Sequence, residues 1–157
     1  MSRVELKSKD AISGKEGRAY LVINGRRHLL FCAKKIKIDF EKQKAEIKTI
    51  GRRVTGHKAT GFSLKGDMTI LQPEDTFTEM AIDYIRTGQD MYFELLIEND
   101  DPTSEAGNKQ TIVRDCNLDN ATLAMLDADA DSLEQEVSFT CEDIDIIKKY
   151  KKLSYGN

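Results

Sequence analysis

The sequence contains no tryptophan and only two prolines among its 157 residues. It also lacks any apolar run that approaches the ~20 residues needed for a membrane-spanning helix. The first ten residues, MSRVELKSKD, have no apolar core of the kind that defines a signal peptide. We therefore expect a protein that is made and kept in the cytoplasm and that does not bind a membrane.

The residue types that usually form catalytic or zinc sites are scarce. Cys32, Cys116 and Cys141 are far apart and form no Cys-x-x-Cys pair, so neither a disulfide framework nor a zinc site is indicated. His28 and His57 are the only histidines, and neither lies in a catalytic signature. We identify no catalytic residue, and we do not expect an enzyme.

Two patterns imitate ligand sites but differ from them at the decisive positions. Gly51–Gly56 begins like a phosphate-binding loop, but His57 and Lys58 follow where Lys and then Ser or Thr are required. The acidic stretch 127–138 begins like a calcium loop, but serine occupies its sixth and twelfth positions instead of glycine and glutamate. No metal and no cofactor is therefore expected.

Charge is distributed unevenly along the chain, although the net charge is only −3. Residues 1–60 hold 16 Lys and Arg against 6 Asp and Glu, whereas residues 61–147 hold 4 against 21. This distribution allows a basic region of one copy to meet an acidic region of another. It equally allows contact with nucleic acid or pairing within one subunit, so charge alone does not decide between these possibilities.

Alternating apolar and polar residues indicate that most of the chain is β-strand. Two strands, Arg18–Ile23 and Arg26–Cys32, flank Asn24-Gly25, which is the strongest two-residue signal for a hairpin. Loops are expected at residues 51–61 and 99–110. Further strands are predicted at residues 36–40, 45–50, 62–70, 91–98, 111–117, 121–127, 134–141 and 143–147.

One segment has the periodicity of a helix. After Pro73, five apolar residues fall on one face at helical spacing, and Gly88 suits the position that follows a helix C-terminus. We predict a helix over about residues 74–87 whose apolar stripe packs in the core against a sheet. The stripe comprises Phe77, Met80, Ala81, Tyr84 and Ile85. Residues 1–157 are then one mainly β domain, with a flexible N-terminal segment 1–11 and a basic C-terminal tail 148–157.

Several segments, in order, resemble the tail tube proteins of contractile phage-like particles, particularly the PBSX-type tube protein of defective prophages. They cover most of the chain, and their collinearity is more specific than any single motif. They are Ile12–Arg18, Gly51–Lys58 with Thr60-Gly61, Asp83-Tyr84, Gly88, Asp90, Tyr92-Phe93, Asp115–Asn117, Leu126–Asp129, Leu133–Val137 and Phe139–Asp143. The match is looser at residues 22–35 and in the basic tail.

The resemblance implies a β-sandwich or barrel-like subunit with one flanking helix, which assembles into sixfold rings around a channel. Neighbouring subunits would pair strands to close one β-barrel, and the rings would stack inside a sheath. The implied partners are further copies of the chain, the tail sheath protein, and tape-measure and baseplate or initiator proteins. DNA would only pass through a tube that belongs to a true phage. The tube would form in the cytoplasm of the bacterial host and end in a phage or headless tail particle.

This resemblance suggests a role for one polar part of the chain. The strand around residues 42–49 and the loop 51–61 would make a poor core, and long ordered loops are usually functional. We expect them to form an arm that contacts a neighbouring subunit or ring. Its candidate contact residues are Lys42, Lys44, Glu46, Lys48, Arg52, Arg53, His57 and Lys58.

Two other interpretations remain at this stage. A small nucleic-acid-binding β module would explain the basic first third, but single-strand binders also need aromatic residues among the cations. The basic loop 51–61 contains none. A ring-forming tube protein of type VI secretion would have a similar architecture, but the segments above do not match it.

Overall fold

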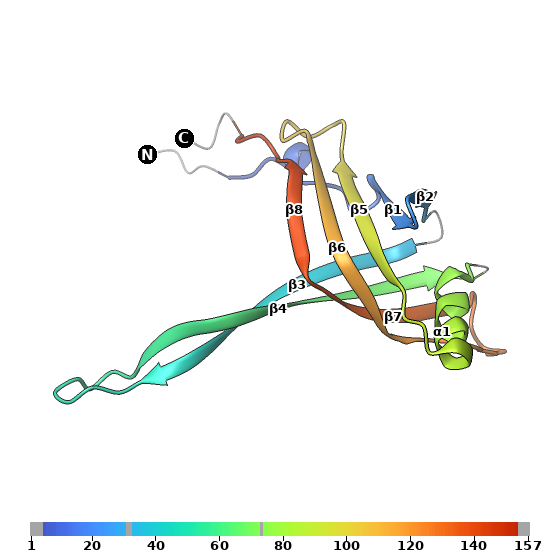
Figure 1. Ribbon diagram of the computed structural model, residues 1–157. Coiled ribbons are helices and arrows are strands. Elements are labelled where there is room, and N and C mark those ends of the chain that lie inside the picture. The colour runs from blue at the N-terminus through green and yellow to red at the C-terminus, as the bar shows by residue number, and fades with distance from the viewer. Residues whose placement is uncertain (1–4, 31–32, 73, 154–157) are drawn as a thin grey trace. The chain divides into compact units, whose positions relative to one another are not determined.

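The computed structural model describes residues 5–30, 33–72 and 74–153 (Figure 1). The chain divides into two compact units. Unit 1 comprises Met1–Phe31, Tyr92–Cys116 and Asp143–Asn157, and unit 2 comprises Cys32–Met91 and Asn117–Glu142. The long strand β6 (Asn108–Ala121) contributes its first part to unit 1 and its last part to unit 2.

Unit 1 is built from antiparallel strands around β5 (Tyr92–Asp100). The strand order is β2-β1-β5-β6, and β8 (Asp143–Lys148) also pairs with β6. The strands β1 (Gly17–Ile23) and β2 (Arg26–Leu29) form the hairpin expected around Asn24-Gly25. Both turn residues have positive φ angles, 51° and 78°, as a tight two-residue hairpin turn requires.

Local hydrogen bonds order the N-terminal part of unit 1. Ser8–Asp10 forms a short 3₁₀ helix, and Asp10 is buried. The carboxylate of Asp10 accepts the backbone N–H of Glu105 at 2.8 Å, and the Ser104 hydroxyl donates to the Asp10 carbonyl at 2.8 Å. These bonds attach the N-terminal segment to the β5–β6 connection.

The β5–β6 connection is shorter than the sequence predicts. The expected loop 99–110 is wrong at both ends, because β5 continues to Asp100 and β6 begins at Asn108. Asp101 is buried and accepts the N–H groups of Ser13 and Thr103, each at 3.0 Å. Backbone pairing and these bonds order a segment that is too polar to be recognised as structured from its composition.

Unit 2 contains an antiparallel sheet in the order β6-β7-β4-β3 and one helix, α1 (Thr76–Thr87). The strands are β3 (Ala33–Ile47), β4 (Gly56–Leu71) and β7 (Glu134–Cys141), and β7 has the bounds that the sequence predicts. The buried apolar side chains of this unit come from β4, α1 and β7. They are Leu64, Met68, Ile70, Phe77, Met80, Val137, Phe139 and Cys141.

At the centre of this sheet the Phe139 ring packs directly against the backbone of Gly66. Gly66 on β4 lies opposite Phe139 on β7 and opposite Ile38 on β3. A Cβ atom at Gly66 would lie 2.2 Å from Cζ of Phe139 and 2.9 Å from Cδ1 of Ile38. The fully buried Phe139 ring can therefore occupy this place only because residue 66 has no side chain.

The helix confirms one prediction and corrects another. α1 lies within the predicted range 74–87 and ends at Gly88, whose φ is 73° and whose N–H donates to the Tyr84 carbonyl at 2.9 Å. Phe77 and Met80 are buried, but Tyr84 and Ile85 are 55% and 68% exposed. The prediction that the whole stripe is core is wrong, because the C-terminal half of α1 borders an open depression rather than a packed strand.

Three other expected boundaries are also wrong. Segment 36–40 and residues 45–47 of segment 45–50, predicted as separate strands, belong to the single strand β3, because β4 supplies backbone partners along it, whereas residues 48–50 lie beyond its end. The loop expected at 51–61 is shorter, since β4 begins at Gly56. The strand expected at 121–127 is absent, because β6 ends at Ala121 and no strand pairs with residues 122–127. Among the described residues no helix is long and apolar enough to cross a bilayer.

Candidate functional site

The β3–β4 hairpin extends beyond the strand that supports it (Figure 1). β7 pairs with β4 only from Leu64 to Leu71, so the last supported pair of the hairpin is Phe40 with Leu64. At about 3.4 Å per residue, β3 continues from Phe40 to Ile47 for about 24 Å as half of a two-stranded ribbon. We call residues 40–63 the arm.

The arm carries an aromatic pair that the rest of unit 2 leaves uncovered. Phe40 and Phe62 are each 61% exposed, and their ring centroids lie 5.9 Å apart. Side chains two residues apart in a strand share a face, so Phe62 continues the face on which Leu64 and Met68 are buried. The apolar face of the sheet therefore runs outward past the end of β7 and onto the arm.

The tip of the arm is an ordered turn that presents an aliphatic side chain. The Arg52 N–H donates to the Thr49 carbonyl at 3.3 Å, and Gly51 has a φ of +83°. A positive φ at the third residue of such a turn is typical of type II geometry, which explains the glycine. Ile50 precedes it with a relative exposure of 106%, and Val54 is also exposed.

All the contact residues expected from the sequence lie on the arm. Glu46 on β3 pairs with His57 on β4, and Lys58 pairs with Ala45 in the next register position. Lys48 follows the end of β3, and the turn and the loop after it carry the two arginines. The residues brought together on this hairpin are Lys42, Lys44, Glu46, Lys48, Arg52, Arg53, His57 and Lys58.

The sequence analysis missed the apolar residues of the arm. Phe40 and Phe62 belong to segments in which apolar and polar residues alternate. This alternation is the same whether the apolar face of the strand is buried or left uncovered beyond the end of the sheet. Ile50 falls at the end of the predicted strand 45–50, and Val54 is isolated among polar residues. Only the register with β7, which ends at Leu64, shows that this part of the hairpin is uncovered.

The arm is also basic. Residues 40–63 hold six Lys and Arg against two Asp and Glu. Residues 64–91 and 117–142, which supply most of the remainder of unit 2, hold two against thirteen. The arm and the body of unit 2 therefore have opposite charge.

The acidic side chains of the β6–β7 connection form local contacts. The carboxylate of Asp127 accepts the backbone N–H of Asp129 at 3.1 Å, as in a short turn. Within residues 5–30, 33–72 and 74–153, no three His, Cys, Asp or Glu side chains are grouped closely enough to hold a metal ion. The arm, with its exposed apolar side chains and its excess of basic residues, is the candidate functional site.

Comparison with known proteins identifies the family. Residues 4–148 match the family described as Phage tail tube protein. The chain is 40% identical over 144 residues to the phage-like element PBSX protein XkdM of Bacillus subtilis (strain 168), covering 92% of this chain and 95% of XkdM. The chain belongs to the phage tail tube protein family. The resemblance in the sequence is thereby confirmed, and it is favoured over the type VI and nucleic-acid-binding alternatives.

Solved structures support the tail tube fold. A chain of the anti-feeding prophage baseplate, a 6-fold symmetrised structure, superimposes with a TM-score of 0.63 at 9% identity, covering 94% of this tail tube protein and 97% of that chain. A chain of the sheath-tube complex of the PVC extracellular contractile injection system, in its extended state, gives a TM-score of 0.64 at 11% identity, covering 88% and 93%. The predicted mainly β fold with a single helix is confirmed.

Proposed function

We propose that copies of this tail tube protein join into closed rings, each of six copies, and that the rings stack into the inner tube of a contractile tail. In this proposal residues 1–157 act as one subunit, and each arm contacts a neighbouring copy. The observation that carries the proposal is the arm, a two-stranded ribbon with exposed Phe40 and Phe62. Aromatic side chains contribute strongly to binding when a partner covers them.

The free edge of the unit 2 sheet supports the same proposal. β3 ends the strand order of this sheet, so within the described part of the chain its outer edge has no strand partner. A long unpaired edge invites pairing with another chain, and soluble monomers usually shorten or cover such edges. A closed ring removes the edge, because each copy provides the partner for the next.

The partners follow from the tube role. The sheath-tube complex that this fold resembles contains a sheath, and we extend that partnership to this chain. Tape-measure and baseplate or initiator proteins would control the length and the start of the tube, and DNA would be passing cargo only. Assembly would take place in the host cytoplasm, and the mature protein would be part of a phage or a headless tail particle.

Self-association provides the direct test. Sedimentation of the purified protein at rising concentration should show rings or larger oligomers, and electron microscopy should show tubes once a tail initiator complex is added. The reason is that head-to-tail contacts between unlike surfaces generate closed rings or open filaments. A species that stays monomeric at every concentration, with no tubes after the initiator is added, would exclude the proposal.

We also propose that the protein has no catalytic activity and needs no cofactor. Addition of a chelator should leave the melting temperature unchanged, because a metal that binds only the folded state would raise it. The measurement is a thermal melt with and without EDTA, and the melt of an EF-hand protein under the same conditions serves as a positive control. A drop of several degrees would contradict this proposal and direct attention to the aspartates at residues 127–131.

A further inference from the structure

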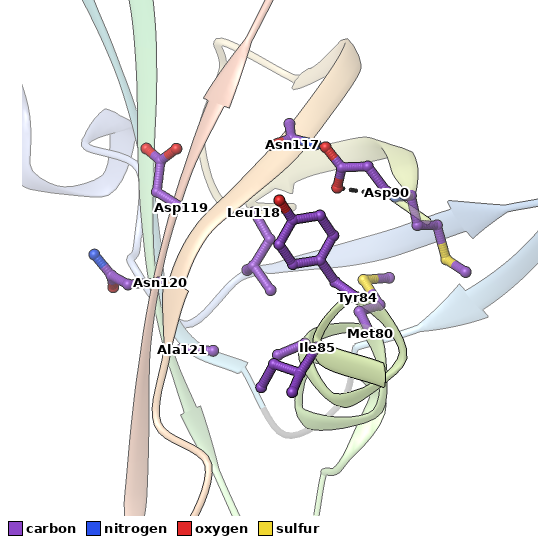
Figure 2. A pocket seen from close by; sticks show the side chains of 11 residues that line it. Met80, Tyr84, Ile85, Asp90, Asn117, Leu118, Asp119, Asn120 and Ala121 are labelled. Carbon is purple, nitrogen blue, oxygen red and sulfur yellow. Dashed lines mark hydrogen bonds between the residues drawn. The ribbon is translucent and has the colours of Figure 1, made fainter. Parts of the chain in front are cut away.

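A depression of about 260 Å³ lies in unit 2 beside the C-terminal half of α1 (Figure 2). One side is formed by α1, from which Met80, Tyr84 and Ile85 project, and the other by the end of β6. This is the part of the helix whose apolar stripe is not covered. The β6 residues in the lining are Asn117, Leu118, Asp119, Asn120 and Ala121, and Ala81, Asp90 and Met91 complete it.

The rim of the depression is acidic and held in place. Asp90 accepts a hydrogen bond from the side-chain amide of Asn117 at 2.7 Å and another from the Met91 N–H at 3.0 Å (Figure 2). Asp119 is exposed on β6 at the same depression. The surface thus combines an apolar wall, formed by Tyr84 and Ile85, with two carboxylates.

We propose that this depression is the receptor for the tip of the arm of a second copy of the chain. The aliphatic side chains Ile50 and Val54 would cover Tyr84 and Ile85, and the arginines of the tip would meet the acidic rim. This inference rests on the proposed function, and it specifies which surface of the neighbour the arm contacts.

The two surfaces are complementary in both charge and polarity. The tip presents exposed aliphatic side chains with arginines on the same short loop, and the receptor presents exposed apolar side chains beside two carboxylates. Apolar burial stabilises such a contact, while opposite charges set its orientation and exclude a contact between two arms. A nucleic acid or an acidic peptide would not fit the receptor, because its rim is negatively charged.

The positions of tip and receptor require two different copies. Both surfaces belong to unit 2, where the tip of the arm and α1 lie at opposite ends (Figure 1). The arm therefore cannot reach the receptor of its own chain. A contact between two unlike surfaces of the same protein is heterologous, and repetition of that contact builds a ring or a filament.

Disulfide cross-linking tests this pairing. Val54→Cys and Ile85→Cys variants are purified separately, mixed, assembled on a tail initiator complex and oxidised. We expect a reducible dimer on a denaturing gel, at a yield several-fold above that of a control mixture of Val54→Cys with Ile147→Cys. Ile147 is exposed but lies on β8, outside the receptor.

A yield no higher than the control, from tubes of normal appearance, would overturn the pairing and leave the proposed function intact. Failure of the unmodified protein to form any tubes would overturn both.

A charge exchange provides an independent measurement. Asp119→Lys and Arg53→Glu should each shorten tubes several-fold, and the double variant should recover most of the lost length because opposite charges again face each other. Asp131→Lys makes the same charge change in the β6–β7 connection, outside the depression, and should leave tube length unchanged. A double variant that assembles no better than the single variants would overturn the pairing.

Discussion

Replacing Gly66 by alanine is expected to lower the free energy of unfolding by about 1–3 kcal/mol, the usual cost of overfilling a packed core. The new Cβ atom would lie 2.2 Å from Cζ of the buried Phe139 ring, so either the ring or the strands β4 and β7 must move. The φ angle of Gly66 is not positive, so backbone strain adds nothing. The restricted unfolded chain offsets only about 0.4–1 kcal/mol of this loss.

The measurement is chemical denaturation beside a matched control. Gly61→Ala adds a Cβ atom to the same strand, but the nearest atom is Oε1 of Gln43 at 3.5 Å, an ordinary contact. The control should change stability by no more than about 0.5 kcal/mol. The double variant Gly66→Ala, Phe139→Leu should lose less free energy of unfolding than the two single variants together, because leucine at position 139 relieves the clash with the new Cβ atom. Equal stability of the two alanine variants would show that the Phe139 ring does not lie over Gly66.

Reversing both Arg52 and Arg53 to Glu is expected to block tube assembly while leaving the fold intact. The arm holds six basic against two acidic side chains, and most of the remainder of unit 2 is strongly acidic. A surface ion pair contributes at most about 1 kcal/mol, or about fivefold in an association constant, but the loss recurs at every contact along a tube. Monomer stability should change by no more than about 0.5 kcal/mol per substitution.

Electron microscopy measures tube length, and a thermal melt of the same variant measures monomer stability. Together they separate a loss of assembly from a loss of folding. Lys148→Glu with Lys149→Glu makes the same change in net charge within the basic tail and should leave tubes intact. Normal tubes from the arginine variant would remove the tip of the arm from the interface. A large fall in melting temperature would instead place these residues within the fold.

The sequence by itself determined the features that depend on neighbouring residues along the chain. Asn24-Gly25 predicted the hairpin because its backbone must adopt positive φ angles, and alternation predicted the bounds of β7. Helical spacing with Gly88 predicted α1 because both are local properties of one segment. The ordered set of tail tube segments identified the family without any structural information.

Only the tertiary structure decided which apolar side chains are covered, because burial depends on strands that are distant in sequence. Alternation gave Phe40 and Phe62 the same pattern as Leu64, yet β7 ends at the level of Leu64 and leaves the two rings exposed. The apolar stripe of α1 is likewise continuous in the sequence pattern, although only its first half is buried in the core. Residues 122–127 have the composition of a strand, but no strand pairs with them beyond the end of β6 at Ala121. Pairing register, which no local pattern encodes, therefore set the length of the arm and left both the arm and the receptor uncovered.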